Sequence, residues 1–270
     1  MSHILSDEKT FAFIHIPKNG GSSLRDQVLD LDDSGRYLSR APEKTAIGPL
    51  QMGHAPLHAI ARLFPEDLTR IRRYRTVAFV RDPVSRFRSA LFQRSREFFG
   101  NDLAALGSGD REKAIHSVLD HLREHPHLPA PEFCHFIRQA DFVDLDGERI
   151  VGHLYPLERM DAAMADISKF LDRSLEVREQ NRTVIRRAGR VTDRASRIWA
   201  GVRPFLPQGV QAGMRRRLRP VFYRSTVETV PELDSHEVRR FLTTYYEGDF
   251  ALVEEVKGRN PGVAFPGASR

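Results

Sequence analysis

The chain has 270 residues, of which 40% are hydrophobic and 29% charged, the profile of a globular protein that can bury a sizeable core. A formal net charge of +6 favours an anionic partner, such as a nucleotide, an acidic glycan, a nucleic acid or an anionic membrane surface. The single cysteine, Cys134, excludes an intrachain disulfide and fits a reducing compartment.

The N-terminus and the lengths of the apolar runs indicate the cellular location. The first ten residues, MSHILSDEKT, lack the long apolar run of a signal peptide. No run of about 18 uninterrupted apolar residues, the minimum for a membrane-spanning helix, occurs in the sequence. We therefore expect a soluble protein of the cytoplasm.

The first third of the chain predicts one buried strand and two short helices. Apolar residues over 11–16 predict a strand that ends at Pro17. A loop rich in glycine and serine follows, and Ser22 or Ser23 can cap a helix over about 24–29. Residues 32–56 contain three prolines and are expected to be mostly loop, whereas 57–64 predict a short amphipathic helix.

The rest of the chain alternates between strand and helix signals. Residues 75–80 predict a second buried strand, followed by a helix to about residue 98 with Asp82 as its N-cap and Pro83 at its first position. Residues 149–160 predict a strand and a turn, and helices are expected over 111–125, 161–172 and 236–256. This alternation predicts an α/β fold of three layers, in which helices flank both faces of a mostly parallel sheet.

Residues 186–224 interrupt this pattern within what we expect to be one domain spanning residues 1–270. The segment holds eleven arginines and one aspartate, with apolar residues scattered among them. We interpret it as a basic helical insert, either a solvated helix pair or an electropositive wall or lid over the site. Its mixture of arginine and apolar side chains also resembles an interfacial membrane contact.

A motif follows each of the first two predicted strands, and ligands of parallel sheets bind at the rim where the strands end. In PKNGGSS, Gly20 and Gly21 allow a ligand to approach the backbone, and the N–H groups up to Ser23 lie at a helix N-terminus that attracts phosphate. Lys18 adds a positive charge. The alternative is an ordinary strand–loop–helix junction with a mobile lysine.

The second motif, RDPVSRFRSAL at residues 81–91, offers a second anion site. Ser89 lies eight residues after Arg81, about two helical turns on, so the two side chains can converge on one anion if the chain turns back after Pro83. Arginine suits a phosphate dianion through its forked donors. Taken alone, this motif is equally typical of a capped helix start with a salt bridge.

Together the motifs resemble the signature of sulfotransferases that use 3′-phosphoadenosine 5′-phosphosulfate (PAPS). HIPKNGGSS resembles the 5′-phosphosulfate loop of the carbohydrate-type branch (sulfotransferase family 2-like), roughly HIPKTGGTS, and the second motif resembles its 3′-phosphate motif, RDPxxRxxSxY. The segments HFIRQADFV, LYPLERM, EQNRT and YYEGDFALV echo later parts of that family in order. Asn19, Ser22 and Leu91 depart from the family's usual Thr, Thr and Tyr.

The resemblance implies a P-loop-like sulfotransferase fold and roles for individual residues. Lys18 would contact the 5′-phosphate and the oxygen that bridges phosphate and sulfate, and would so help the leaving group depart. Arg81 and Ser89 would hold the 3′-phosphate. The loop residues that would hold the 5′ group are Lys18, Asn19, Gly20, Gly21, Ser22 and Ser23. No metal is expected, and the product would be adenosine 3′,5′-bisphosphate (PAP).

The acceptor hydroxyl also needs a base to take its proton. The family places a catalytic histidine between the two motifs, where this chain has His54 and His58, and we expect His54 to be the base. His135 and Glu158 are the alternatives. Cys134 is expected to be a core residue, and four further histidines follow no metal-binding pattern, namely His116, His121, His125 and His127.

We therefore expect a PAPS-dependent O-sulfotransferase that acts on a glycan or another small hydroxyl-bearing acceptor, including an anionic or lipid-linked one. One alternative is a P-loop-type nucleotide kinase, whose lysine should follow the glycines. A second is a nucleic-acid-binding protein that uses residues 186–224, but these arginines match no recognisable nucleic-acid motif, so no nucleic acid is expected. The expected location is the cytoplasm, at a membrane periphery if 186–224 binds lipid. The oligomeric state and the acceptor stay open.

Overall fold

The computed structural model describes residues 3–39, 41–98, 103–177, 184–186, 223–225 and 230–259. The chain divides into one compact unit of residues 1–180 and 230–270 and a second of residues 181–229. In the second unit the described residues are strands β9 (Val184–Arg186) and β10 (Tyr223–Ser225), which pair antiparallel. The expected helical character of the basic insert otherwise falls outside the described residues, as does the segment EQNRT.

A four-stranded sheet forms the centre of the first unit. Its order is β1 (Ile4–Ser6), β2 (Phe11–Phe13), β5 (Arg75–Val80) and β8 (His153–Pro156). The pairs β2–β5 and β5–β8 are parallel, whereas β1 runs antiparallel to β2. The sheet is therefore mostly parallel, as predicted, with an antiparallel edge strand that the sequence analysis did not foresee.

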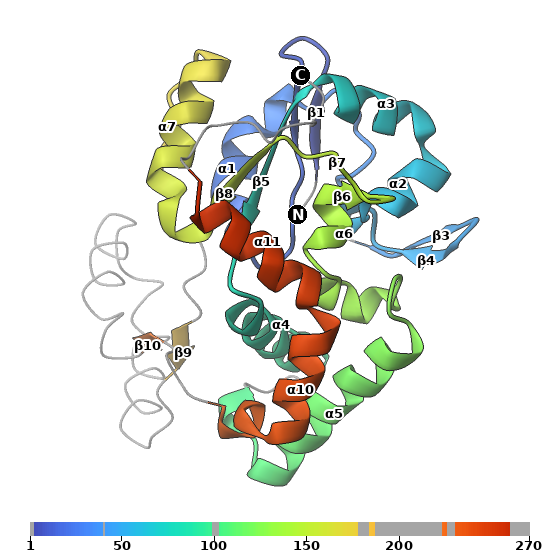
Figure 1. Cartoon of the computed structure of the whole chain (residues 1–270), viewed down its shortest axis with the longest axis vertical. Coiled ribbons are helices and arrows are strands. Elements are labelled where there is room, and N and C mark those ends of the chain that lie inside the picture. The colour runs from blue at the N-terminus through green and yellow to red at the C-terminus, as the bar shows by residue number, and fades with distance from the viewer. Residues whose placement is uncertain are drawn as a thin grey trace, which may run out of the picture. The chain divides into compact units, whose positions relative to one another are not determined.

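Helices lie against both faces of this sheet (Figure 1). Alternate strand residues point to opposite faces, so Phe13 and Phe79 enter one hydrophobic cluster while Ala12 and Ala78 enter another. The first cluster is completed by α1 (Ser22–Val28) and α7 (Met160–Leu171). The second is completed by α2 (Leu57–Leu63), α3 (Pro65–Arg73), α6 (Ala140–Val143) and α11 (Glu247–Lys257). The result is a mixed α/β fold with a helix-flanked sheet.

The remaining elements connect this framework. They include the helices α4 (Pro83–Phe98), α5 (Ser108–Glu124) and α10 (His236–Tyr245). Short 3₁₀ helices are η1 (Leu29–Leu31), η2 (Met52–His54), η3 (Leu103–Ala105), η4 (Pro131–Phe136), η5 (Leu157–Arg159) and η7 (Pro231–Asp234). Two small hairpins pair β3 (Glu43–Thr45) with β4 (Gly48–Leu50) and β6 (Asp144–Leu145) with β7 (Glu148–Arg149).

The start of α4 follows the sequence prediction, whereas the start of α1 does not. Asp82 Oδ1 accepts a hydrogen bond from the backbone N–H of Ser85 at 2.7 Å, which is the predicted cap. The predicted serine cap of α1 is wrong, because the helix already begins at Ser22 and its N-cap is Gly21, which offers no side chain. Both serines therefore lie in the first helical turn.

Two predicted segments differ in extent. Strand β2 ends at Phe13 rather than at residue 16, because the N–H of His15 donates to Nδ1 of His3 at 3.0 Å instead of to a neighbouring strand. The helical periodicity over 236–256 is divided at Tyr246 into α10 and α11. The Tyr246 hydroxyl donates to the Phe136 carbonyl at 2.8 Å, and this buried bond fixes the junction.

Candidate active site

The loop after β2 has a strained backbone that the second motif holds in place. Lys18 has a φ of 68°, in the left-handed region that residues other than glycine and asparagine seldom adopt. Arg81 Nη1 donates to the Lys18 carbonyl at 3.1 Å, and Arg86 Nε donates to the Pro17 carbonyl at 3.0 Å. The two motifs are therefore joined directly, through two arginines of the second and two carbonyls of the first.

The two glycines of the loop are required by their surroundings. Gly20 has a φ of 74°, and a Cβ added there would lie 2.5 Å from Leu157 Cδ1. A Cβ added at Gly21 would lie 2.8 Å from Cζ of Phe13. Gly20 is exposed and Gly21 is buried, so the loop presents backbone without a side chain at Gly20.

Lys18 points from this loop toward α4. Its Nζ donates a hydrogen bond to Oε1 of Gln93, and the side chain is half-buried. Burial, followed by the positive charge of Arg96, lowers the pKa of Lys18 to about 8. Ser89 precedes Gln93 by four residues, so both lie on the same face of α4, the face that Lys18 contacts.

Asn19 faces the protein interior. Its Nδ2 donates to the Phe79 carbonyl and to Gln139 Oε1, both at 2.6 Å, and the residue is 1% exposed. These bonds fasten the loop to the end of β5. The side-chain amide therefore shapes the loop from within and does not reach its outer surface.

Gln139 links the two motifs a second time. Besides accepting from Asn19, its Oε1 accepts from the Arg81 N–H at 2.9 Å, and its Nε2 donates to the Arg81 carbonyl at 2.8 Å. The buried Asp249 accepts from the N–H groups of Gln139 and Ala140 at 2.8 and 2.9 Å. Burial is the main cause that raises the pKa of Asp249 to about 6.

Neither Gln139 nor Asp249 belongs to the two motifs that predicted the site. Their partners lie 58 to 120 residues away along the chain, so no local pattern reveals the contacts. Both residues stand in segments that echo the family, HFIRQADFV and YYEGDFALV, which was the available signal.

Arg81 lies between these anchored groups and solvent. Its side chain is half-buried, and burial, followed by the charge of Arg88, lowers the pKa of its guanidinium. Lys18, Arg81 and Arg86 lie close enough for each arginine to lower the pKa of Lys18. This part of the molecule therefore gathers positive charge suited to an anion of more than one charge.

His54 lies in η2 and is 0% exposed. Neither of its ring nitrogens has a hydrogen-bond partner among the described residues. Its ring centroid is 6.0 Å from that of His15 and 5.0 Å from that of His135. Burial, followed by the charge of His135, holds the pKa of His54 well below its ordinary value, so the ring is a neutral imidazole.

The alternative bases differ in setting. His135 is buried in η4, and its Nε2 has no hydrogen-bond partner in the described part of the chain. Burial, followed by the charge of Lys18, lowers the pKa of His135 to about 3. His58 is half-buried on α2, and Glu158 is exposed on η5.

Three of the four histidines between residues 116 and 127 have partners of their own. His121 Nε2 accepts from the Ala130 N–H at 3.0 Å. His127 Nδ1 lies 2.8 Å from a guanidinium nitrogen of Arg138. His116 lies 3.8 Å from a carboxylate oxygen of Glu237.

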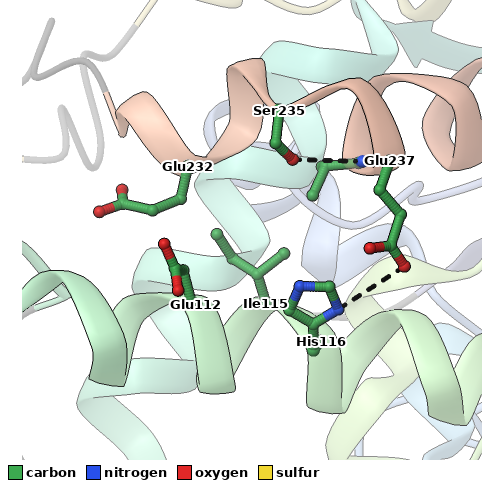
Figure 2. A pocket seen from close by; sticks show the side chains of 7 residues that line it. Glu112, Ile115, His116, Glu232, Ser235 and Glu237 are labelled. Atoms are coloured by element: carbon green, nitrogen blue, oxygen red, sulfur yellow. Dashed lines mark hydrogen bonds and ion pairs between the residues drawn. The ribbon is translucent and has the colours of Figure 1, made fainter.

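Figure 2 shows a pocket of 170 Å³ between α5 and the segment of η7 and α10. The carboxylates of Glu112 and Glu232 lie at one end, and the His116–Glu237 pair lies at the other. Glu232 is engaged by Arg111 at 2.7 Å. No lining residue belongs to either motif, so this pocket is separate from the candidate site.

Comparison with known families supports the resemblance seen in the motifs. A family model described as "Sulfotransferase family", of the family 2 type, matches residues 2–253. The searches of curated proteins and of solved structures gave no match. Among the residues that the structure describes, no helix combines the length and apolar character needed to cross a membrane.

Proposed function

Since the chain belongs to the sulfotransferase family, in its family 2 branch, we propose that it transfers a sulfuryl group from PAPS to a hydroxyl group of an acceptor. The family match supports sulfotransferase activity. The observation that supports PAPS as the donor is the direct joining of two cationic motifs, in which Arg81 bonds the carbonyl of Lys18 and shares Gln139 with Asn19.

A nucleotide phosphorylated at both ends of its ribose fits this arrangement. One phosphate would meet the loop, where Gly20 is exposed with a positive φ directly before the N-terminus of α1. The other would meet Arg81 and Ser89. Because Gln139 fixes one motif against the other, the spacing of the two phosphates would be set before binding.

The donor supplies an activated sulfuryl group, and the chain supplies charge and position. Lys18 would place its ammonium beside the oxygen that becomes the leaving group and balance the negative charge that develops there. With a pKa of about 8, most Lys18 side chains are protonated at neutral pH. Arg81 and the loop amides would hold the two ends in line, as in phosphoryl transfer.

His54 would take the proton of the acceptor hydroxyl on a ring nitrogen. Its neutral ring and its two nitrogens without hydrogen-bond partners among the described residues support this role. Since His54 is 0% exposed, an acceptor would reach it only after the side chains that cover it move. His135, whose ring lies 5.0 Å away, is the second candidate.

The acceptor that we propose is a glycan or another small molecule with a hydroxyl group, including an anionic or lipid-linked one. The proposed fold is the three-layer, P-loop-like fold of sulfotransferases, and the proposed location is the cytoplasm, at a membrane periphery if residues 186–224 bind lipid. The charge gathered around Lys18 and Arg81 supports an anionic donor, and the segment of eleven arginines supports an anionic acceptor.

A two-donor transfer assay tests the proposal. The protein is incubated with neutral and acidic oligosaccharides, glycolipids and small alcohols, with either sulfate-labelled PAPS or γ-phosphate-labelled ATP and Mg²⁺. We expect label to be transferred from PAPS only, and His54→Ala to lower this transfer by about 10²–10⁴-fold. The same variant should bind PAP within about twofold of the wild type, because His54 touches neither phosphate site in this account. Transfer from ATP instead of PAPS would establish a kinase.

A further inference from the structure

Three buried side chains with metal-binding atoms converge beside the candidate active site. They are His54 on η2 and the adjacent residues Cys134 and His135 on η4. One ligand atom from each lies within 4.8 Å of the other two. His135 is also close enough to Lys18 for the lysine charge to lower its pKa.

Three of the four imidazole nitrogens of this cluster have no hydrogen-bond partner in the described part of the chain. Both ring nitrogens of His54 and Nε2 of His135 are buried without a hydrogen-bond partner among the described residues. A buried polar atom that makes no hydrogen bond is costly, so such atoms in a native protein commonly meet water, an ion or a ligand. Two buried imidazoles, each with a nitrogen within 4.8 Å of one thiol sulfur, therefore indicate a site for a cation.

The nitrogen and sulfur atoms of these side chains indicate which type of cation would bind. Imidazole nitrogen and thiolate sulfur suit borderline-soft ions such as Zn²⁺ and Co²⁺, whereas Mg²⁺ and Ca²⁺ prefer oxygen. Tetrahedral zinc, at about 2.0–2.3 Å from nitrogen and sulfur, needs ligand atoms about 3.3–3.8 Å apart, so the three atoms would have to approach one another by at most about 1.5 Å. The fourth position would remain for water.

Protonation is compatible with such a site. Burial keeps both imidazoles neutral at pH 7, so no proton competes with the ion there. The thiol of Cys134 now donates to Gln51 Oε1 at 2.9 Å, and burial raises its pKa to about 12. A coordinated metal ion deprotonates a thiol outright, so binding would release that proton and break this bond.

We propose that His54, Cys134 and His135 bind one zinc-type cation, and that the bound ion prevents His54 from acting as a base. The second half rests on the proposed function. The ion would occupy the nitrogen that must accept the proton of the acceptor, and the site would then be inhibitory rather than catalytic.

Cobalt binding tests the site without any use of enzyme activity. The apo protein is titrated with Co²⁺ and its absorption spectrum is recorded. A thiolate-to-cobalt charge-transfer band should grow to one equivalent, and Zn²⁺ should abolish it by displacement. The chain has a single cysteine, so this band can come only from Cys134. Absence of the band at saturating Co²⁺ would overturn the proposal.

Variants then assign the other ligands. Cys134→Ser should remove the band, and His54→Asn and His135→Asn should each weaken Co²⁺ binding by more than about tenfold. His125→Asn is the matched control: His125 is exposed and its ring lies 4.7 Å from that of His121, so the variant removes one histidine of a pair outside the cluster and should change nothing. Full-affinity binding by both cluster histidine variants would contradict the assignment.

The inhibitory half is measured separately. Zn²⁺ should suppress sulfuryl transfer by the wild type at the concentration that fills the site, and a chelator should restore it. Inhibition is expressed relative to the metal-free rate of each variant. Cys134→Ser should need about tenfold more Zn²⁺ than the wild type for the same fractional inhibition. A normal cobalt band in a protein without transfer activity would refute the proposed function and leave the metal site intact. Transfer that Zn²⁺ at site saturation does not affect would refute the inhibitory role.

Discussion

At the residue scale, Lys18 combines two unusual features. Its backbone is left-handed, and its side chain is half-buried among other cations. The strain is held by hydrogen bonds from Arg81 and Arg86 to this loop. The burial and the neighbouring charges lower its pKa to about 8, so the charge of Lys18 can change near physiological pH.

This pKa predicts how the affinity for PAP depends on pH. The phosphate dianion binds the protonated lysine, and a lowered pKa means that the proton is lost from the free protein as the pH rises through about 8. The affinity should therefore be constant below that pH and fall by about tenfold per pH unit above it. Titration calorimetry with PAP between pH 7 and 9.5 measures this dependence.

Lys18→Arg is the matched control for this prediction. A guanidinium stays protonated throughout the range, because its pKa is about 12 or higher, so the fall above pH 8 should disappear even if the affinity is lower overall. The second phosphate ionisation, with a pKa of about 6, lies outside the range. Equal slopes in both proteins would show that another group titrates.

At the element scale, the parts of the fold that the sequence predicted are those whose signals are local. Strand β5 is a continuous apolar run, and the cap at Asp82 and Pro83 at the first position define the start of α4. The edge strand β1 has three residues, too few for a periodic signal, and helix α3 was also missed. The division at Tyr246 depends on a bond to Phe136, which lies 110 residues earlier in the chain.

In the candidate site, too, residues with a local sequence signal could be predicted and those defined by long-range contacts could not. Lys18, Gly20, Gly21 and Arg81 could be proposed from the sequence because each lies in a short motif directly after a strand. Gln139 was missed because its role comes from contacts that only the folded chain creates. Likewise, the neighbours of His54 on η4 cannot be inferred from its own segment, MGH.

Replacing Gln139 tests whether the second link between the motifs matters. Gln139→Met keeps the size but leaves the N–H and carbonyl groups of Arg81 without these partners, and removes one acceptor from Asn19. We expect the free energy of unfolding to fall by about 2–3 kcal/mol in urea titrations. The affinity for PAP should fall by about tenfold or more, because its two phosphate sites are no longer held in register.

The neighbouring residue supplies the control. Arg138→Met removes a partly exposed ion pair with Asp141 and should cost about 1 kcal/mol or less. It should leave the affinity for PAP unchanged. If Gln139→Met bound PAP as tightly as the wild type, the link would be structural only.

At the scale of the whole molecule, the basic character of the chain comes from one segment. Residues 187–222 contain nine arginines and one aspartate, so without them the formal net charge would change from +6 to −2. The overall charge therefore says little about the proposed nucleotide site, where the cations are Lys18, Arg81 and Arg86. The overall charge instead reflects the anionic partner that we propose for the segment itself.

Excision of residues 187–222 tests whether nucleotide binding is independent of the charge of this segment. Arg186 and Tyr223 are directly opposite in the β9–β10 pair, so an Asn-Gly turn can join them as a hairpin. The shortened chain should bind PAP within about twofold of the wild type, since neither motif lies in the segment. It should lose co-sedimentation with vesicles of phosphatidylserine and phosphatidylcholine, and vesicles of phosphatidylcholine alone are the control. Undiminished binding to the anionic vesicles would remove the proposed membrane contact.

The central claim is that the site binds a nucleotide phosphorylated at both the 3′ and 5′ positions. Calorimetric titration of the wild type with PAP, with adenosine 5′-monophosphate and with ATP and Mg²⁺ tests it most directly. PAP should bind about 100-fold more tightly than the monophosphate, and Arg81→Ala should reduce this ratio to about tenfold or less. Arg62→Ala, which removes an exposed arginine of α2, should leave the ratio unchanged. Equal binding of PAP and the monophosphate, or binding of ATP with Mg²⁺ as tight as that of PAP, would contradict the claim.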